Sequence, residues 1–272
     1  MSLTSHTLAK RKETLVYQDI KNIIKQKALT TVFQPIIDIT HEKIIGYEAL
    51  TRGPIDSDYV LPDILFQTAT ECGLLSELEI LCRDIAIKKF VELKLTGKLF
   101  LNISPLVLLD NAHPQGETIK FVEQAGLNCQ QIVIELSEKY PFHNAETLSK
   151  ALEKYRQFGF DVAIDDLGAG YSGLKLWSQL RPNIVKIDRY FVENCHLDSF
   201  KRKFITAIFE LAKSAQADVI VEGIECFQEF DLLRKLGMVY AQGYYIAKPT
   251  NEPIRTYPNR LKHHFLYPIQ AC

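Results

Sequence analysis

Residues 184–221 read IVKIDRYFVENCHLDSFKRKFITAIFELAKSAQADVIV, and this stretch contains one complete strand–helix–strand unit. Ile184–Ile187 and Val219–Val221 are short apolar runs of the strand type. Between them, 199–215 spaces its apolar residues as one face of a helix does. A helix between two short apolar runs predicts two parallel strands that are joined by a crossover helix.

The same alternation extends over most of the chain. The apolar runs that we expect to form strands are Phe33–Ile39, Ile44–Leu50, Leu99–Ile103, Ile132–Leu136, Val162–Ile164, Ile184–Ile187, Val219–Val221 and Tyr244–Ala247. The segments with helical periodicity and few breakers are 77–93, 146–158, 199–215 and 227–236. Eight strands that alternate with helices favour a closed barrel over an open sheet, so the predicted fold class is α/β, a TIM-like (β/α)8 barrel.

One connection departs from a regular barrel. The first two expected strands are separated only by Thr40–Lys43, which is too short for a crossover helix. These two strands should therefore form an antiparallel hairpin, with the first strand antiparallel to the rest.

Both ends of the chain differ from this pattern. Residues 10–29 have the periodicity of an amphipathic helix, for which packing on the domain's own surface is favoured over a coiled-coil or partner role. After Pro249 the strand periodicity is lost and prolines become frequent. We therefore expect one domain over 12–250, flanked by an N-terminal tail (1–11) and a C-terminal tail (251–272).

Composition excludes several classes of protein. The 272 residues include 32 basic and 33 acidic ones, so no global positive charge indicates binding to a nucleic-acid polymer. No apolar run approaches the roughly 20 residues that a membrane span needs, and the N-terminus has no apolar signal core. None of the six cysteines lies in a C-x-x-C pair, so reduced thiols in a cytoplasmic protein are expected.

Polar residues mark the downstream ends of the expected strands. They are Glu48, Asn102, Glu135, Asp165, Asp166, Lys186, Asp188 and Glu222, with Gln242 just before the eighth run. In a parallel barrel these ends meet on one face, where barrel enzymes have their active sites. Carboxylates that converge there would repel one another unless a cation neutralised them. Oxygen ligands without cysteine or clustered histidine favour Mg²⁺ or Mn²⁺ over zinc.

Each of these residues also has an ordinary structural interpretation. A single acid after a strand is more often a helix cap or a surface charge, and Asp165 and Asp166 before a glycine-containing segment are compatible with a turn. Lys186 and Asn102, each between apolar residues, are harder to explain in this way, because burying an unpaired polar group is unfavourable. The whole series is poorly explained by coincidence.

A series of motifs resembles the EAL-domain cyclic di-GMP phosphodiesterases. Glu48-Ala49-Leu50 followed by Thr51-Arg52 is similar to the signature that names this family. The other motifs follow in order: Phe33-Gln34-Pro35-Ile36, Leu101-Asn102-Ile103-Ser104-Pro105, Glu135-Leu136-Ser137-Glu138, Asp165-Asp166-Leu167-Gly168-Ala169-Gly170-Tyr171-Ser172, Val185-Lys186-Ile187-Asp188-Arg189, Glu222-Gly223-Ile224-Glu225 and Gln242-Gly243-Tyr244. The resemblance covers roughly residues 12–250.

The resemblance implies a site for two divalent cations, Mg²⁺ or Mn²⁺. One cation would be held by Glu48, Asn102, Glu135 and Asp165, and Asp165 would bridge to a second cation that Asp166 and Glu222 complete. Two such cations would act on a phosphodiester oxygen and on a water between them. Lys186 would position or polarise that water, and Glu222 has an alternative role as general base.

The resemblance also assigns roles around this centre. Gln34, Arg52 and Gln242 are expected to contact the substrate. Glu138 would anchor the loop 167–172, although a charge at a helix N-terminus is an equal alternative for it. Asp188 and Glu225 are expected to support the loop or Lys186.

Three residues depart from the family pattern, namely Leu167 for a phenylalanine, Ala169 for a threonine and Ser137 for a threonine. None of them removes an expected ligand. The implied activity is hydrolysis of cyclic di-GMP to linear pGpG in bacterial second-messenger signalling, by a cytoplasmic homodimer. The alternatives are a receptor that binds cyclic di-GMP without turnover and a barrel enzyme that acts on another phosphodiester or phosphorylated metabolite.

Overall fold

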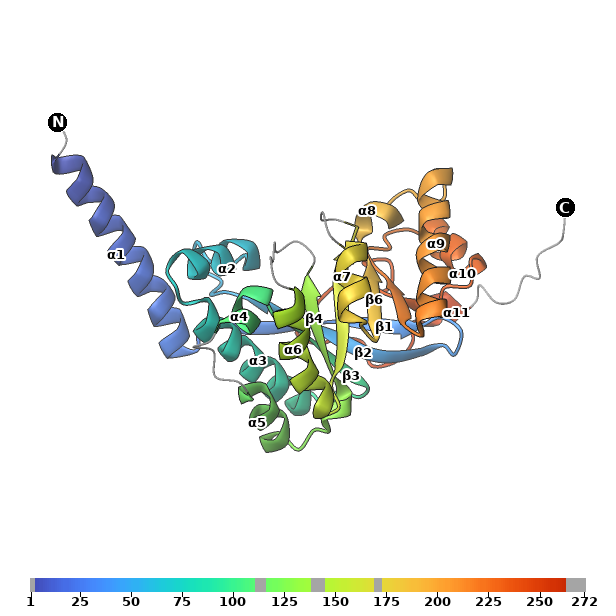
Figure 1. Cartoon of the computed structure of the whole chain (residues 1–272), viewed down its shortest axis with the longest axis horizontal. Helices are drawn as coiled ribbons and strands as arrows, with labels where there is room; N and C mark the ends of the chain where they lie inside the picture. Colours follow the sequence, from blue (N-terminus) through green and yellow to red (C-terminus); the bar gives the residue numbers. More distant parts are fainter. Residues whose placement is uncertain (1–2, 111–115, 138–144, 169–172, 263–272) are drawn as a thin grey trace, which may run out of the picture.

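Eight strands close into one barrel in chain order, β1 to β8 (Figure 1). The structure, a computed structural model, describes residues 3–110, 116–137, 145–168 and 173–262, and the side chains of its first helix from residue 14 onward. The strands are β1 (Thr30–Asp38), β2 (Lys43–Arg52), β3 (Lys98–Asn102), β4 (Ile132–Ser137), β5 (Asp161–Leu167), β6 (Ile184–Ile187), β7 (Asp218–Val221) and β8 (Tyr240–Ala241). The predicted α/β barrel is confirmed.

β1 runs opposite to both of its neighbours. It pairs antiparallel with β2 and with β8, whereas the remaining neighbouring pairs are parallel. The turn between β1 and β2 is held by Asp38, whose Oδ1 accepts hydrogen bonds from the backbone N–H groups of Thr40 and His41, both at 2.9 Å. This aspartate turn makes a hairpin possible in so short a connection, as predicted.

The predicted eighth strand, Tyr244–Ala247, is wrong. β8 is instead Tyr240–Ala241, which pairs with β7 on one side and β1 on the other. Residues 244–246 form a turn, in which the N–H groups of Ile246 and Ala247 both donate to the carbonyl of Gly243. An apolar composition without alternation did not distinguish a buried turn from a strand. Gln242 therefore follows the eighth strand instead of preceding it.

Helices surround the barrel. They are α1 (Leu3–Gln26), α2 (Pro62–Glu71), α3 (Leu75–Glu92), α4 (Pro105–Leu109), α5 (Glu117–Gln124), α6 (Ala145–Gln157), α7 (Gly173–Leu180), α8 (Arg189–Val192), α9 (Ser199–Ala215), α10 (Phe227–Lys235) and α11 (Asn259–Lys262), with a 3-10 turn η1 (Cys129–Gln131). The four predicted helices are confirmed as α3, α6, α9 and α10. The helices that periodicity missed, α2, α4, α5, α7, α8 and α11, span ten residues or fewer, which is too short for a clear pattern.

Apolar side chains fill two layers. The barrel interior contains one layer drawn from six strands: Ile36, Phe100, Val133, Ala163, Ile184 and Ile220. The alternate residues of the same strands point outward and pack under the helices in a larger core, to which Val185 and Ile187 of β6 belong. This inner layer closes one end of the barrel interior and leaves the carboxyl ends of the strands for polar residues.

α1 lies on one side of the barrel, opposite α9, α10 and α11, and its N-terminal end extends away from the body (Figure 1). Ile20 and Ile23 are buried in a separate cluster with residues of α2 and α3, among them Leu65 and Leu78. This confirms that the helix predicted over 10–29 packs on the domain's own surface. The expected boundary between residues 11 and 12 falls within α1, and the division into tails and domain remains a prediction.

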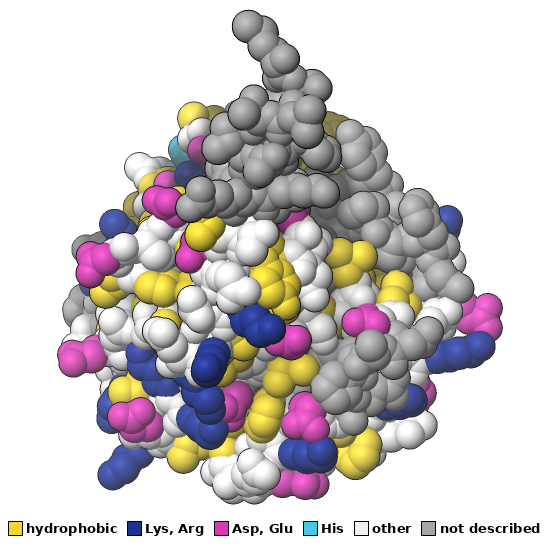
Figure 2. Space-filling view, turned by 90° about the vertical axis from the view of Figure 1, so that its left-hand side faces the viewer, with side chains coloured by type: hydrophobic (Ala, Val, Ile, Leu, Met, Phe, Trp, Pro, Cys, Tyr) yellow, Lys and Arg dark blue, Asp and Glu magenta, His cyan; other side chains and the backbone are white. Residues whose placement is uncertain are grey.

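The side of the molecule that carries α1 shows no large area of one charge. Lys and Arg side chains lie among Asp and Glu side chains over the described surface of this side (Figure 2). Among the described residues, no helix is both long and apolar enough to cross a bilayer.

Candidate active site

The charged residues at the strand ends are the next inward-facing positions beyond the apolar layer. Because successive side chains of a strand point to opposite faces, a residue two positions further along faces the same interior. Val133 is followed in this way by Glu135 in β4, and Ile184 by Lys186 in β6. The same step leads from Phe100, Ala163 and Ile220 to Asn102, Asp165 and Glu222. The pattern that builds the core thus also gathers the site.

Lys186 is the centre of this group. Its side chain is fully buried, and its Nζ lies 2.6 Å from Glu222 Oε1 and 2.7 Å from Glu135 Oε1. The same nitrogen lies 3.1 Å from Asp165 Oδ1 and 3.3 Å from Glu48 Oε2. Four carboxylates, three from strands β2, β4 and β5 and one from the residue after β7, therefore surround one ammonium group, which leaves an excess of negative charge in a buried place.

This excess shifts the pKa values of the group. Burial raises the pKa of Glu135 and Glu222 well above the usual range, and neighbouring carboxylates raise it further while Lys186 opposes the rise. Burial raises the pKa of Asp165 in the same way. Burial lowers the pKa of Lys186, but the surrounding carboxylates outweigh it and raise that pKa well above its usual value. The ammonium is charged, and the carboxylates hold protons more readily than exposed ones.

Amide side chains connect the carboxylates. Asn102 lies beside Glu135 in the register of β3 and β4, and its Nδ2 lies 3.3 Å from Glu48 Oε1 and 3.5 Å from Glu135 Oε2. Gln242 donates to Glu48 Oε2 at 2.7 Å and to Gln34 Oε1 at 3.0 Å. The eighth strand was predicted at the wrong residues, but Gln242 still belongs to the site. It follows β8 directly and reaches the same face of the barrel as the other strand ends.

Asp166 occupies an unusual backbone conformation. Its φ is +58°, in the left-handed region that few non-glycine residues adopt, and this turns its side chain away from the alternation of β5. Ser137 Oγ donates to Asp166 Oδ2 at 3.1 Å. Strained conformations of this kind are maintained where surrounding contacts hold them, often at functional sites. Gly168 follows with a φ of +98°, and a Cβ there would lie 2.2 Å from the ring of Phe191, so only glycine fits.

The acidic side chains form two overlapping groups. Carboxylate oxygens of Glu48, Glu135 and Asp165 lie within 4.8 Å of one another, and so do those of Asp165, Asp166 and Glu222. Asp165 belongs to both groups. The donors are all oxygens and carry surplus negative charge, which is the donor set of hard divalent cations such as Mg²⁺ and Mn²⁺. The residues present therefore fit hard divalent cations.

Two cavities open on this face and meet at the carboxylates. One has a volume of about 370 Å³ and is lined by Arg52, Asn102 and Ser104, among others. The other has a volume of about 270 Å³ and is lined by Gln34, Asp188 and Tyr244, among others. Both include Glu48, Asp165 and Asp166 in their walls. A ligand with two lobes can therefore lie across the acidic centre.

The remaining predicted site residues make contacts outside the group around Lys186. Arg52 donates to the carbonyl of Thr51 at 2.8 Å in the wall of the larger cavity. Asp188 caps α8 by accepting a hydrogen bond from Tyr190 N at 2.7 Å. Glu225 pairs with Arg189 at 2.5 Å. Glu138 and residues 169–172 of the loop lie outside the described residues.

Sequence reasoning missed a buried acid beneath the loop that follows β3. Glu79 of α3 accepts the backbone N–H of Ser104, at 3.1 and 3.2 Å from its two oxygens, and pairs with Arg83 at 3.2 Å. Ser104 is two residues after Asn102, so Glu79 holds the segment that carries this ligand. The spacing of four between a Glu and an Arg on the expected helix 77–93 was the available signal.

Comparisons with known proteins agree with this geometry. The family described as "EAL domain" matches residues 17–249. PdeA of Escherichia coli (strain K12), described as a probable cyclic di-GMP phosphodiesterase, is 29% identical over 242 residues, which cover 88% of this chain and 33% of that protein. This chain spans 30–44% of the length of PdeA, PdeB and PdeI, three curated relatives from the same strain.

Solved structures are similar over most of this chain. A standalone EAL protein from Vibrio cholerae O395, in a c-di-GMP-bound form, is 29% identical with a TM-score of 0.74 and covers 85% of this chain and 96% of its own. BlrP1 of Klebsiella pneumoniae, in a complex with manganese and cyclic di-GMP, is 25% identical with a TM-score of 0.74 and covers 82% of this chain and 56% of its own.

Proposed function

The chain belongs to the EAL domain family, and on this premise we propose that it hydrolyses cyclic di-GMP to linear pGpG with the help of two divalent cations. The observation that carries the proposal is the arrangement of four carboxylates around the buried Lys186, with Asp165 common to two acidic groups. A structural ion pair needs one acid for one base. The surplus of acids is explained when the site also binds cations.

The cation ligands would be Glu48, Asn102, Glu135 and Asp165 on one side and Asp165, Asp166 and Glu222 on the other. When bound there, Mg²⁺ or Mn²⁺ would polarise a phosphate oxygen and lower the pKa of a water molecule. Asn102 can turn either its nitrogen to the carboxylates or its oxygen to a cation. Gln242, which bonds Glu48, fixes the orientation of that carboxylate.

Lys186 and Glu222 would carry the catalytic roles. Lys186 keeps its positive charge, so it would offset the negative charge that develops on the phosphate in the transition state. Glu222 has a side chain that is 15% exposed beside Lys186, so it would accept a proton from the attacking water at a carboxylate oxygen. The water oxygen would bond to phosphorus, the bond from phosphorus to one ribose oxygen would break, and that oxygen would take up the proton that Glu222 received, which opens the ring to pGpG.

The substrate would lie across both cavities, with the scissile phosphate at the carboxylates. Arg52 would contact a phosphate or a guanine edge, since its planar guanidinium donates two parallel hydrogen bonds. Gln34 and Gln242, which bond to each other, would contact the substrate from the smaller cavity. Glu138, Asp188 and Glu225 would support the neighbouring loops. We further propose that the protein acts as a homodimer in the bacterial cytoplasm, with the catalytic domain over 12–250.

The test is turnover by the purified chain with cyclic di-GMP and either Mg²⁺ or Mn²⁺. We expect pGpG as the product, and loss of activity by a factor of about 100 to 1,000 or more in Glu48→Ala, which removes a cation ligand and the contact to Lys186. Glu146→Ala, in an exposed pair on α6, is the matched control and should keep wild-type activity.

Three outcomes distinguish the alternatives. Formation of pGpG supports the proposal. Tight binding of cyclic di-GMP without turnover in either cation would identify a receptor instead. Turnover of another phosphodiester that cyclic di-GMP does not inhibit would identify a different substrate.

A further inference from the structure

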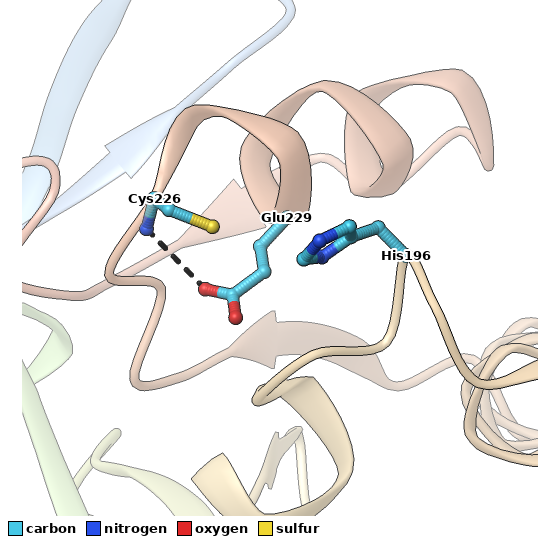
Figure 3. A group of neighbouring side chains, drawn as sticks. All are labelled: His196, Cys226 and Glu229. Carbon is cyan, nitrogen blue, oxygen red and sulfur yellow. Dashed lines mark hydrogen bonds between the residues drawn. The ribbon is translucent and has the colours of Figure 1, made fainter.

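A second group of metal-binding side chains lies away from the strand ends. His196 belongs to the connection between α8 and α9, whereas Cys226 and Glu229 lie at the start of α10 (Figure 3). One ligand atom of each residue lies within 4.8 Å of those of the other two. Figure 3 shows the imidazole ring and the thiol on either side of the Glu229 carboxylate.

Glu229 is buried and held in place by backbone groups. Its Oε1 accepts Asn194 N at 2.8 Å, and its Oε2 accepts Glu225 N at 2.9 Å and Cys226 N at 3.4 Å. An ionised carboxylate offers about four acceptor sites, of which three are used here. Oε1 therefore keeps a lone pair that is free for a cation. The capping of α10 explains the position of Glu229 and Cys226.

Capping does not explain His196. Its Nδ1 is buried and makes no hydrogen bond to any of the residues that the structure describes. A buried polar atom without a partner is unfavourable by about 1–3 kcal/mol, so such atoms usually have a ligand. The backbone of His196 is fixed, because Arg202 Nη1 donates to its carbonyl at 3.0 Å and to the carbonyl of Cys195 at 3.3 Å.

We propose that His196, Cys226 and Glu229 bind a transition-metal cation of borderline softness, with Zn²⁺ as the preferred ion. A thiolate and a carboxylate neutralise its two charges, and the imidazole supplies a third ligand, which leaves the fourth tetrahedral position to water. Zinc bonds of about 2.0–2.3 Å require ligand atoms some 3.3–3.8 Å apart, so each distance within the group closes by at most about 1.5 Å. A thiol and an imidazole disfavour Mg²⁺, which separates this site from the acidic one.

Cys195, the neighbour of His196, does not belong to this group: its side chain is fully buried, and the ligand atoms that lie within 4.8 Å of one another are those of His196, Cys226 and Glu229. The proposed site also fastens the segment that leads back to Glu222, because Glu229 holds the N–H of Glu225.

The test is Co²⁺ binding to the chelator-treated full chain in excess Mg²⁺, followed by absorption. Co²⁺ bound to a thiolate gives a charge-transfer band, which oxygen ligands alone do not give, so binding at the acidic site is distinguished. We expect that one equivalent of Co²⁺ binds to the chain and gives this band. Addition of Zn²⁺ should displace the Co²⁺ and abolish the band. This binding test does not depend on catalytic activity.

Two variants remove the ligands with little effect on folding. Cys226→Ser keeps a side chain that caps helices well and should abolish the band, and His196→Ala should weaken Co²⁺ binding at least about tenfold. Cys129→Ser and His41→Ala, which change the same residue types elsewhere, should bind like the wild type. A wild type without the band, or a band that survives in Cys226→Ser, overturns the proposal.

Discussion

Two buried centres of charge lie near each other in this barrel and are built differently. Around Lys186, four carboxylates at the ends of different strands face one ammonium group. Under the loop after β3, Glu79 faces a single Arg83 one turn away on the same helix and also accepts the N–H of Ser104. The first centre has surplus negative charge, whereas the second is balanced by its own partners.

This difference in charge balance distinguishes a centre that binds a ligand from a centre that stabilises the fold. A charge-balanced pair such as Glu79 and Arg83 holds elements together, since Arg83 Nε also donates to Thr118 Oγ1 at 2.9 Å, while Arg83 Nη2 makes no hydrogen bond to the described residues. A surplus of carboxylates is unfavourable to folding by itself, and it persists where a ligand supplies the missing charge. Replacing Lys186 should therefore mainly lower the activity, whereas replacing Arg83 should mainly lower the stability of the fold.

The largest effect is expected from Lys186→Met compared with Arg83→Met. Lys186→Met should lower turnover of cyclic di-GMP by about 100- to 1,000-fold or more, because it removes the positive charge beside the reacting phosphate. Arg83→Met should instead lower the free energy of unfolding by about 3–5 kcal/mol, since it leaves Glu79 buried without its partner. Steady-state kinetics and urea unfolding of both variants make the comparison.

Lys150→Met is the matched control, because Lys150 forms an exposed pair with Glu146 on α6. It should change unfolding by less than about 1 kcal/mol and leave turnover unchanged. If Arg83→Met lost turnover as severely as Lys186→Met while remaining folded, the separation of the two centres would be wrong.

A smaller effect is expected when cations are added. Mn²⁺ at about 100 times its dissociation constant should stabilise the wild type by roughly 2.7 kcal/mol, because only the folded chain assembles the acidic ligands. Asp165→Asn, which weakens both groups at once, should lose most of this gain. The measurement is the thermal midpoint with and without Mn²⁺ in a buffer free of other divalent ions. Arg83→Met should keep the full gain, and an equal loss in both variants would contradict the comparison.

The sequence allowed the acidic centre to be predicted better than the balanced pair. Glu135 and Lys186 each follow an inward-facing apolar residue by two positions in a strand. Strand alternation alone therefore predicts that both face the barrel interior next to the apolar layer. The position of β8 could not be predicted, because its two residues carry no pattern and only pairing with both β1 and β7 defines it. Contacts between distant segments, such as Glu79 with Ser104, depend on how α3 packs against a loop, which no local pattern contains.

The last comparison concerns the pH dependence of the balanced pair. Burial raises the pKa of Glu79 to about 7, while Arg83 and Ser104 oppose the rise, and its ordinary value is 4.5. Between pH 4.5 and 7 the folded chain therefore holds a proton on Glu79 that the unfolded chain has released. The contribution of Glu79 to the free energy of unfolding should fall as the pH rises through this window, by at most about 3 kcal/mol, and level off above it.

Glu79→Gln removes the titrating group while keeping an oxygen for the N–H of Ser104. Urea unfolding at several pH values between 5 and 8, in saturating Mn²⁺, should give a smaller decline for this variant than for the wild type. Glu146→Gln, on the exposed surface of α6, should decline as the wild type does. Arg83→Met should move the decline to higher pH, because loss of the guanidinium raises the pKa of Glu79 further. Parallel curves for the wild type and Glu79→Gln would mean that Arg83 and Ser104 fully offset the burial of this acid, which would make the pair more balanced than its raised pKa indicates.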